Sequence, residues 1–179
     1  MIVGSIVACE VGFWVLLAAG PAARYGLRWP RVGAALLVCV PLVDVVLVVA
    51  TVIDLRGGAV ATAAHGLAGA YIGFSVAFGH GLIKAADVRV AHRFAGGPAP
   101  VPPPQRGPLR VRLECQVWGR ALLAWFIACG VLILVMVAVG DASRTQQLSL
   151  WIQGLSAVLV LWLLAGPLLT VARTGLSRP

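Results

Sequence analysis

Three ionisable residues interrupt long apolar stretches of this sequence, and an aromatic hydroxyl follows one of them. Glu10, Asp44 and His65 each lie inside an apolar run, and Tyr71 comes two helical turns after His65. If these runs cross a bilayer, such groups are costly and usually mark an ion or proton pathway. With a helical rise of about 1.5 Å per residue, Asp44 falls near mid-depth and Glu10 and His65 nearer one boundary. We therefore predict one intramembrane polar cluster containing Glu10, Asp44, His65 and Tyr71.

Two roles for this cluster are open. In the first, Asp44 and Glu10 carry a proton or a cation and His65 relays it. In the second, the side chains satisfy one another and fix the helix arrangement, since polar contacts of this kind contribute only about 0.6 kcal/mol each. Pro41 precedes Asp44 by three residues. A proline there frees the carbonyl of Leu37 and bends the helix, which leaves room for water or an ion.

The sequence gives little support for a haem site, a metal site or a known catalytic motif. His65 and His80 belong to one apolar run, but a bis-histidine haem needs ligands from another helix, and the third histidine, His92, lies outside the runs. The sequence has four cysteines without a C-x-x-C pair, no H-E-x-x-H and no phosphate-binding glycine loop. We therefore expect no metal and no cofactor, and the sequence leans against an enzyme.

Composition places the chain in a membrane. Of its 179 residues, 60% are hydrophobic and 11% are charged, and the mean hydropathy is +0.97. A soluble domain carries about 25% charged residues, so lipid must cover most of this surface. The net charge of +8 would suit nucleic acid, but the cations stand between apolar runs, where they set orientation and meet anionic headgroups. We expect no nucleic-acid partner.

Five apolar runs are long enough to cross a hydrocarbon core of about 30 Å. We predict an all-α, polytopic transmembrane bundle that forms a single membrane domain over residues 1–179. The first run has no preceding Lys or Arg and contains Glu10, so we predict a retained helix and not a signal peptide. The predicted spans are residues 2–22, 32–53, 59–82, 119–140 and 148–171.

The cations between the runs predict an orientation. Twelve of the fourteen Lys and Arg residues fall on one side of the five runs, and Arg56 and Arg144 fall on the other. Because cytoplasmic loops collect Lys and Arg, the twelve-cation side is predicted to be inside. The N-terminus is then outside and the C-terminus is in the cytoplasm.

The predicted cytoplasmic loop, residues 83–118, is basic and rich in proline. Its prolines, from residue 98 to 104, are typical of a stiff spacer, although they would also suit an SH3-like groove. We expect its cations to contact anionic lipid on the cytoplasmic side; these are Lys84, Arg89, Arg93, Arg110 and Arg112.

Small residues recur at every fourth position of the third run. Such a row lets another helix approach closely in a membrane. We predict a helix-packing ridge, headed by His65, that consists of Gly69, Gly73, Ala77 and Gly81. The ridge could serve a neighbouring helix, a second copy of the chain or another membrane protein.

Several segments between residues 51 and 98 together resemble a family of small, uncharacterised bacterial integral membrane proteins. The resemblance is carried, in order, by residues 51–56 (TVIDLR), 61–68 (ATAAHGLA), 78–80 (FGH), 86–89 (ADVR) and 93–98 (RFAGGP). It implies a bacterial plasma membrane and a five-helix topology, and it supplies no activity.

Two functions remain in view. The first is a non-enzymatic accessory or scaffold component of the plasma membrane, which the lack of a catalytic motif and the basic loop favour. The alternative is a small proton- or cation-coupled transporter or channel that uses the intramembrane carboxylates. The chain shows no internal repeat of the kind that many transporters have, which favours the first.

Overall fold

The computed structural model describes residues 11–176 except 13, 17, 28, 105 and 106, and over this part of the chain it is all-helical, without a strand. The described residues between 11 and 21 are helical. The elements that follow are η1 (Ala22–Gly26), α2 (Pro30–Arg56), α3 (Ala63–Ala95), α4 (Pro108–Val139), α5 (Gln146–Leu163), η2 (Leu164–Leu168) and α6 (Leu169–Leu176).

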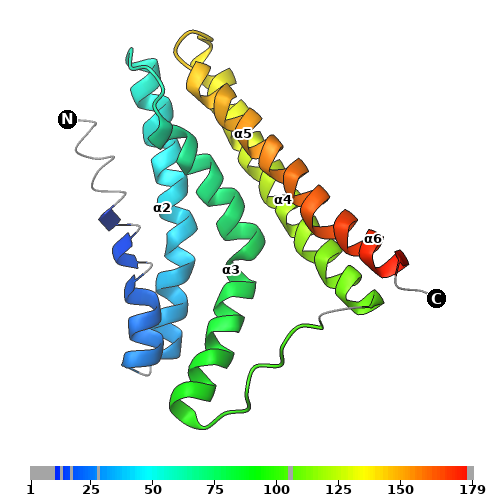
Figure 1. Ribbon diagram of the computed structural model, residues 1–179. Coiled ribbons are helices and arrows are strands. Elements are labelled where there is room, and N and C mark those ends of the chain that lie inside the picture. Colours follow the sequence, from blue (N-terminus) through cyan, green and yellow to red (C-terminus); the bar gives the residue numbers. More distant parts are fainter. Residues whose placement is uncertain (1–10, 13, 17, 28, 105–106, 177–179) are drawn as a thin grey trace.

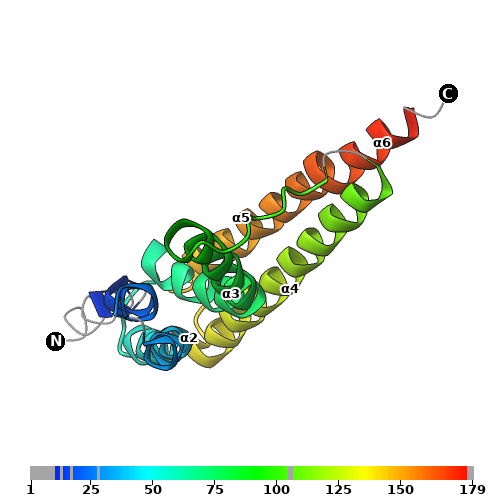
Figure 2. The same cartoon turned by 90° about the horizontal axis from the view of Figure 1, so that it is seen from below.

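The long helices form two hairpins, α2 with α3 and α4 with α5, as Figures 1 and 2 show. The turns at residues 57–62 and 140–145 lie at the same end of the molecule, which we call the turn end. The C-terminal part of α3, the start of α4 and α6 lie at the opposite end, the basic end. Towards the basic end α3 diverges from α4 and α5 (Figure 1).

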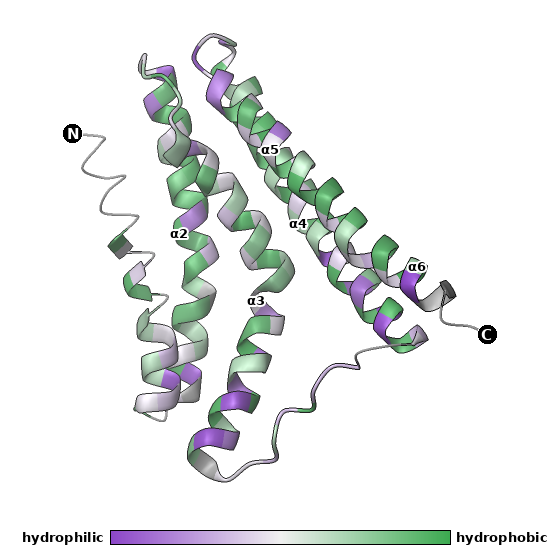
Figure 3. Ribbon diagram, viewed as in Figure 1, coloured by the Kyte–Doolittle hydropathy of each residue, from purple (hydrophilic) through white to green (hydrophobic). Residues whose placement is uncertain are grey.

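Four of these helical segments are long and apolar enough to cross a membrane: Arg31–Arg56, Ala63–Phe94, Pro108–Val139 and Gln146–Arg173. The first predicted span, 2–22, falls largely on residues outside the described part. Figure 3 shows hydrophobic colouring along most of each helix and hydrophilic colouring gathered at the two ends. Large apolar side chains point outward on α4, such as Phe126, Leu134 and Val137, where lipid is the solvent.

Helices α3 and α4 extend well into the predicted loop 83–118, and cap residues explain where they stop. Gly96 ends α3 with a φ of 66°, a left-handed conformation that glycine adopts without steric cost. Gly107 has a φ of 87°, and Pro108 then starts α4 at the first helical position, where a missing N–H costs nothing. The linker between the two helices is therefore confined to residues 96–107, of which 96–104 and 107 are described and non-helical.

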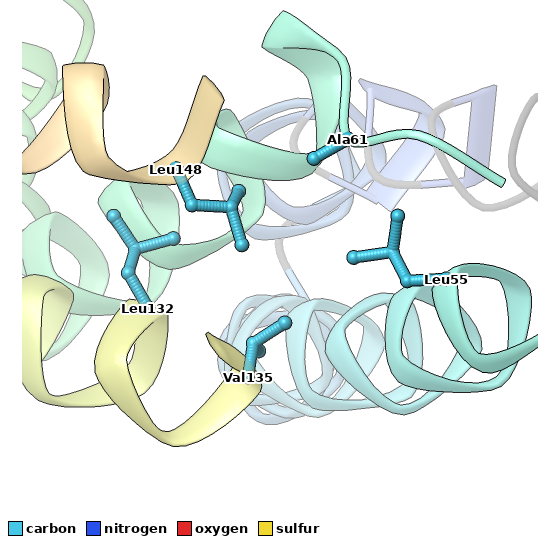
Figure 4. Packing of buried hydrophobic residues seen from close by; sticks show 5 residues of the cluster. All are labelled: Leu55, Ala61, Leu132, Val135 and Leu148. Atoms are coloured by element: carbon cyan, nitrogen blue, oxygen red, sulfur yellow. The ribbon is translucent and has the colours of Figure 1, made fainter. Parts of the chain in front are cut away.

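A cluster of buried apolar side chains joins the two hairpins near the turn end. It consists of Leu55, Ala61, Leu132, Val135 and Leu148 (Figure 4). Leu55 and Leu148 are completely buried. The backbone N–H of Ala61 also donates to the carbonyl of Arg144 at 2.8 Å. The two turns are thus fixed to each other, and the helices leave this end in set directions.

Glycines of α3 permit its close contact with α4. A Cβ at Gly69 would lie 2.8 Å from Cδ2 of Leu132, and a Cβ at Gly73 would lie 2.3 Å from the carbonyl oxygen of Ala124. Nearer the basic end, a Cβ at Gly81 would lie 3.2 Å from the guanidinium of Arg120. Glycine is therefore required at Gly73, where the obstacle is backbone and cannot rotate away.

Candidate functional site

Asp44 lies on the buried face of α2. Helical periodicity places Val40, Asp44, Leu47, Thr51 and Leu55 on one stripe, and the structure buries all five. Asp44 is 2% exposed, and its Oδ2 atom has no hydrogen-bond partner in the described part of the chain. A buried polar atom without a partner carries a large desolvation cost, so this oxygen is the strongest sign of a binding site.

Asp44 opens into a pocket of about 230 Å³ between α2, α3 and the helical residues that precede η1. Leu47, Ala64, Leu67 and Ala68 form its apolar walls. Tyr71 and Trp14 complete the lining with one hydroxyl and one indole. The structure thus brings Asp44 and Tyr71 to the same cavity. Glu10, the fourth member of the predicted cluster, lies outside the described residues.

His65 belongs to a different polar contact, at the start of α3. Because α3 begins at Ala63, His65 is in its first turn, and its Nδ1 atom accepts the backbone N–H of Thr62 at 2.9 Å. In the neutral ring the proton is then on Nε2, which lies 3.8 Å from Oδ2 of Asp54 and makes no hydrogen bond with a described residue. His65 is not among the described residues that line the Asp44 pocket, so the structure does not bring it together with Asp44 and Tyr71.

Thr51 lies between these two polar places on α2. It is 2% exposed, and its Oγ1 atom also lacks a hydrogen-bond partner within the described residues. By helical rise, Thr51 lies about 10 Å from Asp44 and about 5 Å from Asp54 along the axis. Buried atoms with unmet hydrogen-bonding capacity therefore recur from the turn end down to Asp44.

The turn end carries a second group of charges, which are satisfied. Arg144 contacts Asp141 at 3.1 Å and donates to the carbonyl of Leu55 at 3.3 Å, while Arg56 donates to the carbonyl of Ala138 at 2.8 Å. Hydrogen bonds that Ser143 donates hold the pKa of Asp141 below its usual value, and the bond from the Ser143 hydroxyl has the largest effect. These contacts join the hairpins and are structural.

Polar contacts of Arg24 and Tyr25, in η1, hold this segment to Asp87 of α3; we call them the ionic clasp. Arg24 binds both carboxylate oxygens of Asp87 at 2.7 Å, and the Tyr25 hydroxyl donates to the same carboxylate at 2.7 Å. Burial raises the pKa of Tyr25, and its bond to Asp87 acts in the same direction. The sequence gives no local signal for this clasp, because its partners are more than sixty residues apart.

The cations expected to contact lipid lie near the basic end. Lys84, Arg89 and Arg93 are exposed on the last turns of α3. On α4, Arg112 is exposed, whereas Arg110 forms an ion pair with Glu114 four residues later. The Arg110 charge is therefore already partly neutralised by its own helix.

Comparison with known proteins gives one informative relative. The chain is 37% identical over 144 residues to YmcC of Bacillus subtilis (strain 168), whose description is an uncharacterised membrane protein. The alignment covers 80% of this chain and 77% of the relative. This chain belongs to the same family. No protein-family model matches it, and neither does any solved structure.

Family membership confirms the resemblance found in the sequence between residues 51 and 98, and the alignment extends it over most of the chain. The protein is accordingly a membrane protein of a bacterial type, as its four long apolar helices also indicate. The relative's description gives no substrate, so the Asp44 pocket has to be interpreted from its own chemistry.

Proposed function

We propose that the protein binds and moves a proton or a monovalent cation within the membrane, with Asp44 as the carrier. The observation that supports it most directly is the buried Asp44 side chain, which lines a 230 Å³ pocket and whose Oδ2 atom has no hydrogen-bond partner among the described residues. An isolated carboxylate charge is very costly in a low-dielectric interior. A proton or a bound cation neutralises it, and exchanging that partner is the elementary step of transport.

The pocket has room for the ligand and its water. Its volume is far above the roughly 10–15 Å³ that a single water needs. Toward the turn end, Thr51 Oγ1 and His65 Nε2 offer further unmet hydrogen-bonding capacity, and Asp54 stands beside His65. A water chain along these groups would connect Asp44 with the turn end. His65 then acts near the entrance at the turn end, and the carrier Asp44 lies further along the path.

We also propose the orientation that the charges favour. The exposed cations Lys84, Arg89, Arg93 and Arg112 gather at the basic end, which the distribution of Lys and Arg assigns to the cytoplasm. With five spans, the N-terminus is outside and the C-terminus is cytoplasmic. The Asp44 pocket is then reached from the outside, through the turn end.

An accessory or scaffold role is the second candidate, and the linker between α3 and α4 favours it. Its residues 98–103 are exposed, and Val101 is 91% exposed. An extended, proline-rich segment between two basic helix ends suits recognition by a partner in the cytoplasm. This role would leave the Asp44 pocket with a purely structural part.

The test is proton and cation flux into liposomes that contain purified protein. We expect flux from the wild type and no flux from Asp44→Asn. The control Asp141→Asn changes an aqueous carboxylate at the turn end and should retain the flux. Folded wild type that transports no more than empty liposomes overturns the transport proposal and leaves the accessory role.

A second measurement probes the carboxyl group directly. Dicyclohexylcarbodiimide modifies protonated carboxyl groups in apolar surroundings, and mass spectrometry locates the adduct. We expect modification at Asp44, slowed by a bound cation, and none at Asp87 in its clasp or at Asp141. Failure to modify Asp44 in folded protein would argue that the pocket is closed to exchange.

A further inference from the structure

A second cavity lies on the other side of α3, between α3 and the α4–α5 hairpin. Its volume is about 330 Å³, which lies within the range of small-molecule sites. Alanines of α3 and α4, including Ala70 and Ala124, form its floor, and aromatic side chains such as Phe74, Phe78 and Trp125 form its walls. We call this cavity the α3–α4 groove.

The packing of α3 explains why the groove exists. Near the turn end, Gly66 lies against Trp151 and Gly69 against Leu132, so the helices touch. Towards the basic end α3 diverges from α4 and α5 (Figure 1). The larger side chains Phe74 and Phe78 follow Gly73 on α3, line the groove and stack with their ring centroids 5.1 Å apart. The aromatic surface stays partly uncovered; Phe74 is 50% exposed.

The groove presents apolar surface to its occupant. The indole N–H of Trp125, which lines the groove, donates to Ser156 Oγ at 2.9 Å. Trp118 lies about two helical turns nearer the basic end on α4, and its indole N–H donates to the carbonyl of Leu159 at 3.2 Å. Both indole donors are therefore used between α4 and α5. The occupant that suits such a wall is a hydrocarbon chain, which the surrounding bilayer supplies.

Positive charge stands at the end of the groove that faces the basic end. Arg120 precedes the groove residue Ala121, and its guanidinium reaches α3 beside Gly81. Arg120 is exposed and makes no hydrogen bond or ion pair with any described residue. Lys84, exposed as well, follows Gly81 by one turn of α3. Two exposed cations thus lie near the end of the groove where a headgroup would lie.

We propose that the α3–α4 groove binds one anionic phospholipid, with an acyl chain along Phe74 and Phe78 and the phosphate on Arg120 and Lys84. Lipid tails are as apolar as the groove, so the chain alone gives no preference over bulk lipid. Selectivity comes from the cations, as in basic pockets between membrane helices that hold anionic headgroups. This inference does not depend on the role of Asp44.

The test is native mass spectrometry of the full-length protein in micelles that contain equal amounts of phosphatidylglycerol and phosphatidylcholine. The wild type is expected to retain one phosphatidylglycerol in preference. Arg120→Gln should lower the ratio of the two lipids about fivefold, the effect of one cation near a headgroup. The matched control Arg31→Gln removes an exposed cation of α2 that does not line the groove and should leave the ratio unchanged.

A second pair of variants tests the chain-binding part. Ala70→Leu fills the groove and should reduce retention of both lipids, whereas Ala157→Leu, on an exposed part of α5 that does not line the groove, should not. Circular dichroism and gel filtration establish that each variant is folded. Equal retention of the two lipids by the wild type, equal effects within either pair, or a lipid-free dimer would each overturn the proposal.

Discussion

The contact between α3 and α4 at Gly73 predicts a stability change that can be isolated by a matched control. A Cβ at Gly73 would lie 2.3 Å from the carbonyl oxygen of Ala124 and 3.0 Å from Cβ of Ala128. Because the first obstacle is backbone, Gly73→Ala forces the two helices apart. Gly79, on the same helix, has nothing within 4 Å of the equivalent position, so Gly79→Ala meets no neighbour.

The two substitutions share one favourable effect and differ in one unfavourable effect. Replacing glycine by alanine inside a helix gains about 0.8–1 kcal/mol of helix propensity at either site. Overpacking a well-packed contact costs about 1–3 kcal/mol, and only Gly73→Ala has that cost. The free energy of unfolding should therefore be about 1–3 kcal/mol lower in Gly73→Ala than in Gly79→Ala.

Equilibrium unfolding in mixed micelles, followed by circular dichroism, measures this difference. Each variant is compared with the wild type at the same detergent composition, so the micelle contributes equally. If Gly73→Ala unfolds at the same point as Gly79→Ala, the close approach of α3 and α4 is not the arrangement in the membrane, and the groove argued from it is lost as well.

Three further predictions concern polar contacts. Arg24→Gln should lower the free energy of unfolding by about 1 kcal/mol, and in a double-mutant cycle it should have little further effect once Asp87→Asn is present. The Thr62 side chain forms a capping box with His65 at the start of α3; Thr62→Ala removes it, so hydrogen exchange in the first turn of α3 should speed up, with about 1 kcal/mol of stability lost. The lowered pKa of Asp141 adds stability above its unfolded pKa of about 3.9, which is lost as the pH falls through the folded pKa. The difference between the thermal midpoints of wild type and Asp141→Asn should therefore be largest at pH 7 and should shrink as the pH falls below about 3.9.

Sequence alone predicts the long helices well because the signal for a membrane helix is strong. Runs of apolar residues with charges between them identify the four long helical segments without any tertiary information. The ends of these helices are harder to predict from apolar runs alone, since α3 continues past Lys84 through a polar, amphipathic stretch. Gly96 and Pro108 are the residues that mark the ends of the linker, and both are readable from the sequence as helix stop and start signals.

The candidate site shows where sequence reasoning stops. Asp44 is conspicuous because it is a charge in an apolar run, and the helical rise places Tyr71 at a similar depth. The same reasoning predicts His65 in this cluster, but α3 begins at Ala63, and Thr62 and Asp54 are the polar neighbours of His65. The Arg24–Asp87 clasp depends on how the first helical residues pack on α3, and no local pattern encodes that.

The Asp44 pocket and the α3–α4 groove are not independent, because Tyr71 lines both. Gly73 lies two residues further along α3, so separating α3 from α4 at that point moves the wall that the cavities share. We therefore expect Gly73→Ala to change both the carbodiimide modification of Asp44 and the retention of phosphatidylglycerol, and Gly79→Ala to change neither. If Gly73→Ala lowers stability while modification and lipid retention stay at wild-type values, the two cavities do not depend on this helix contact. A change in both would mean that the position of α3 controls how the carrier carboxyl is reached.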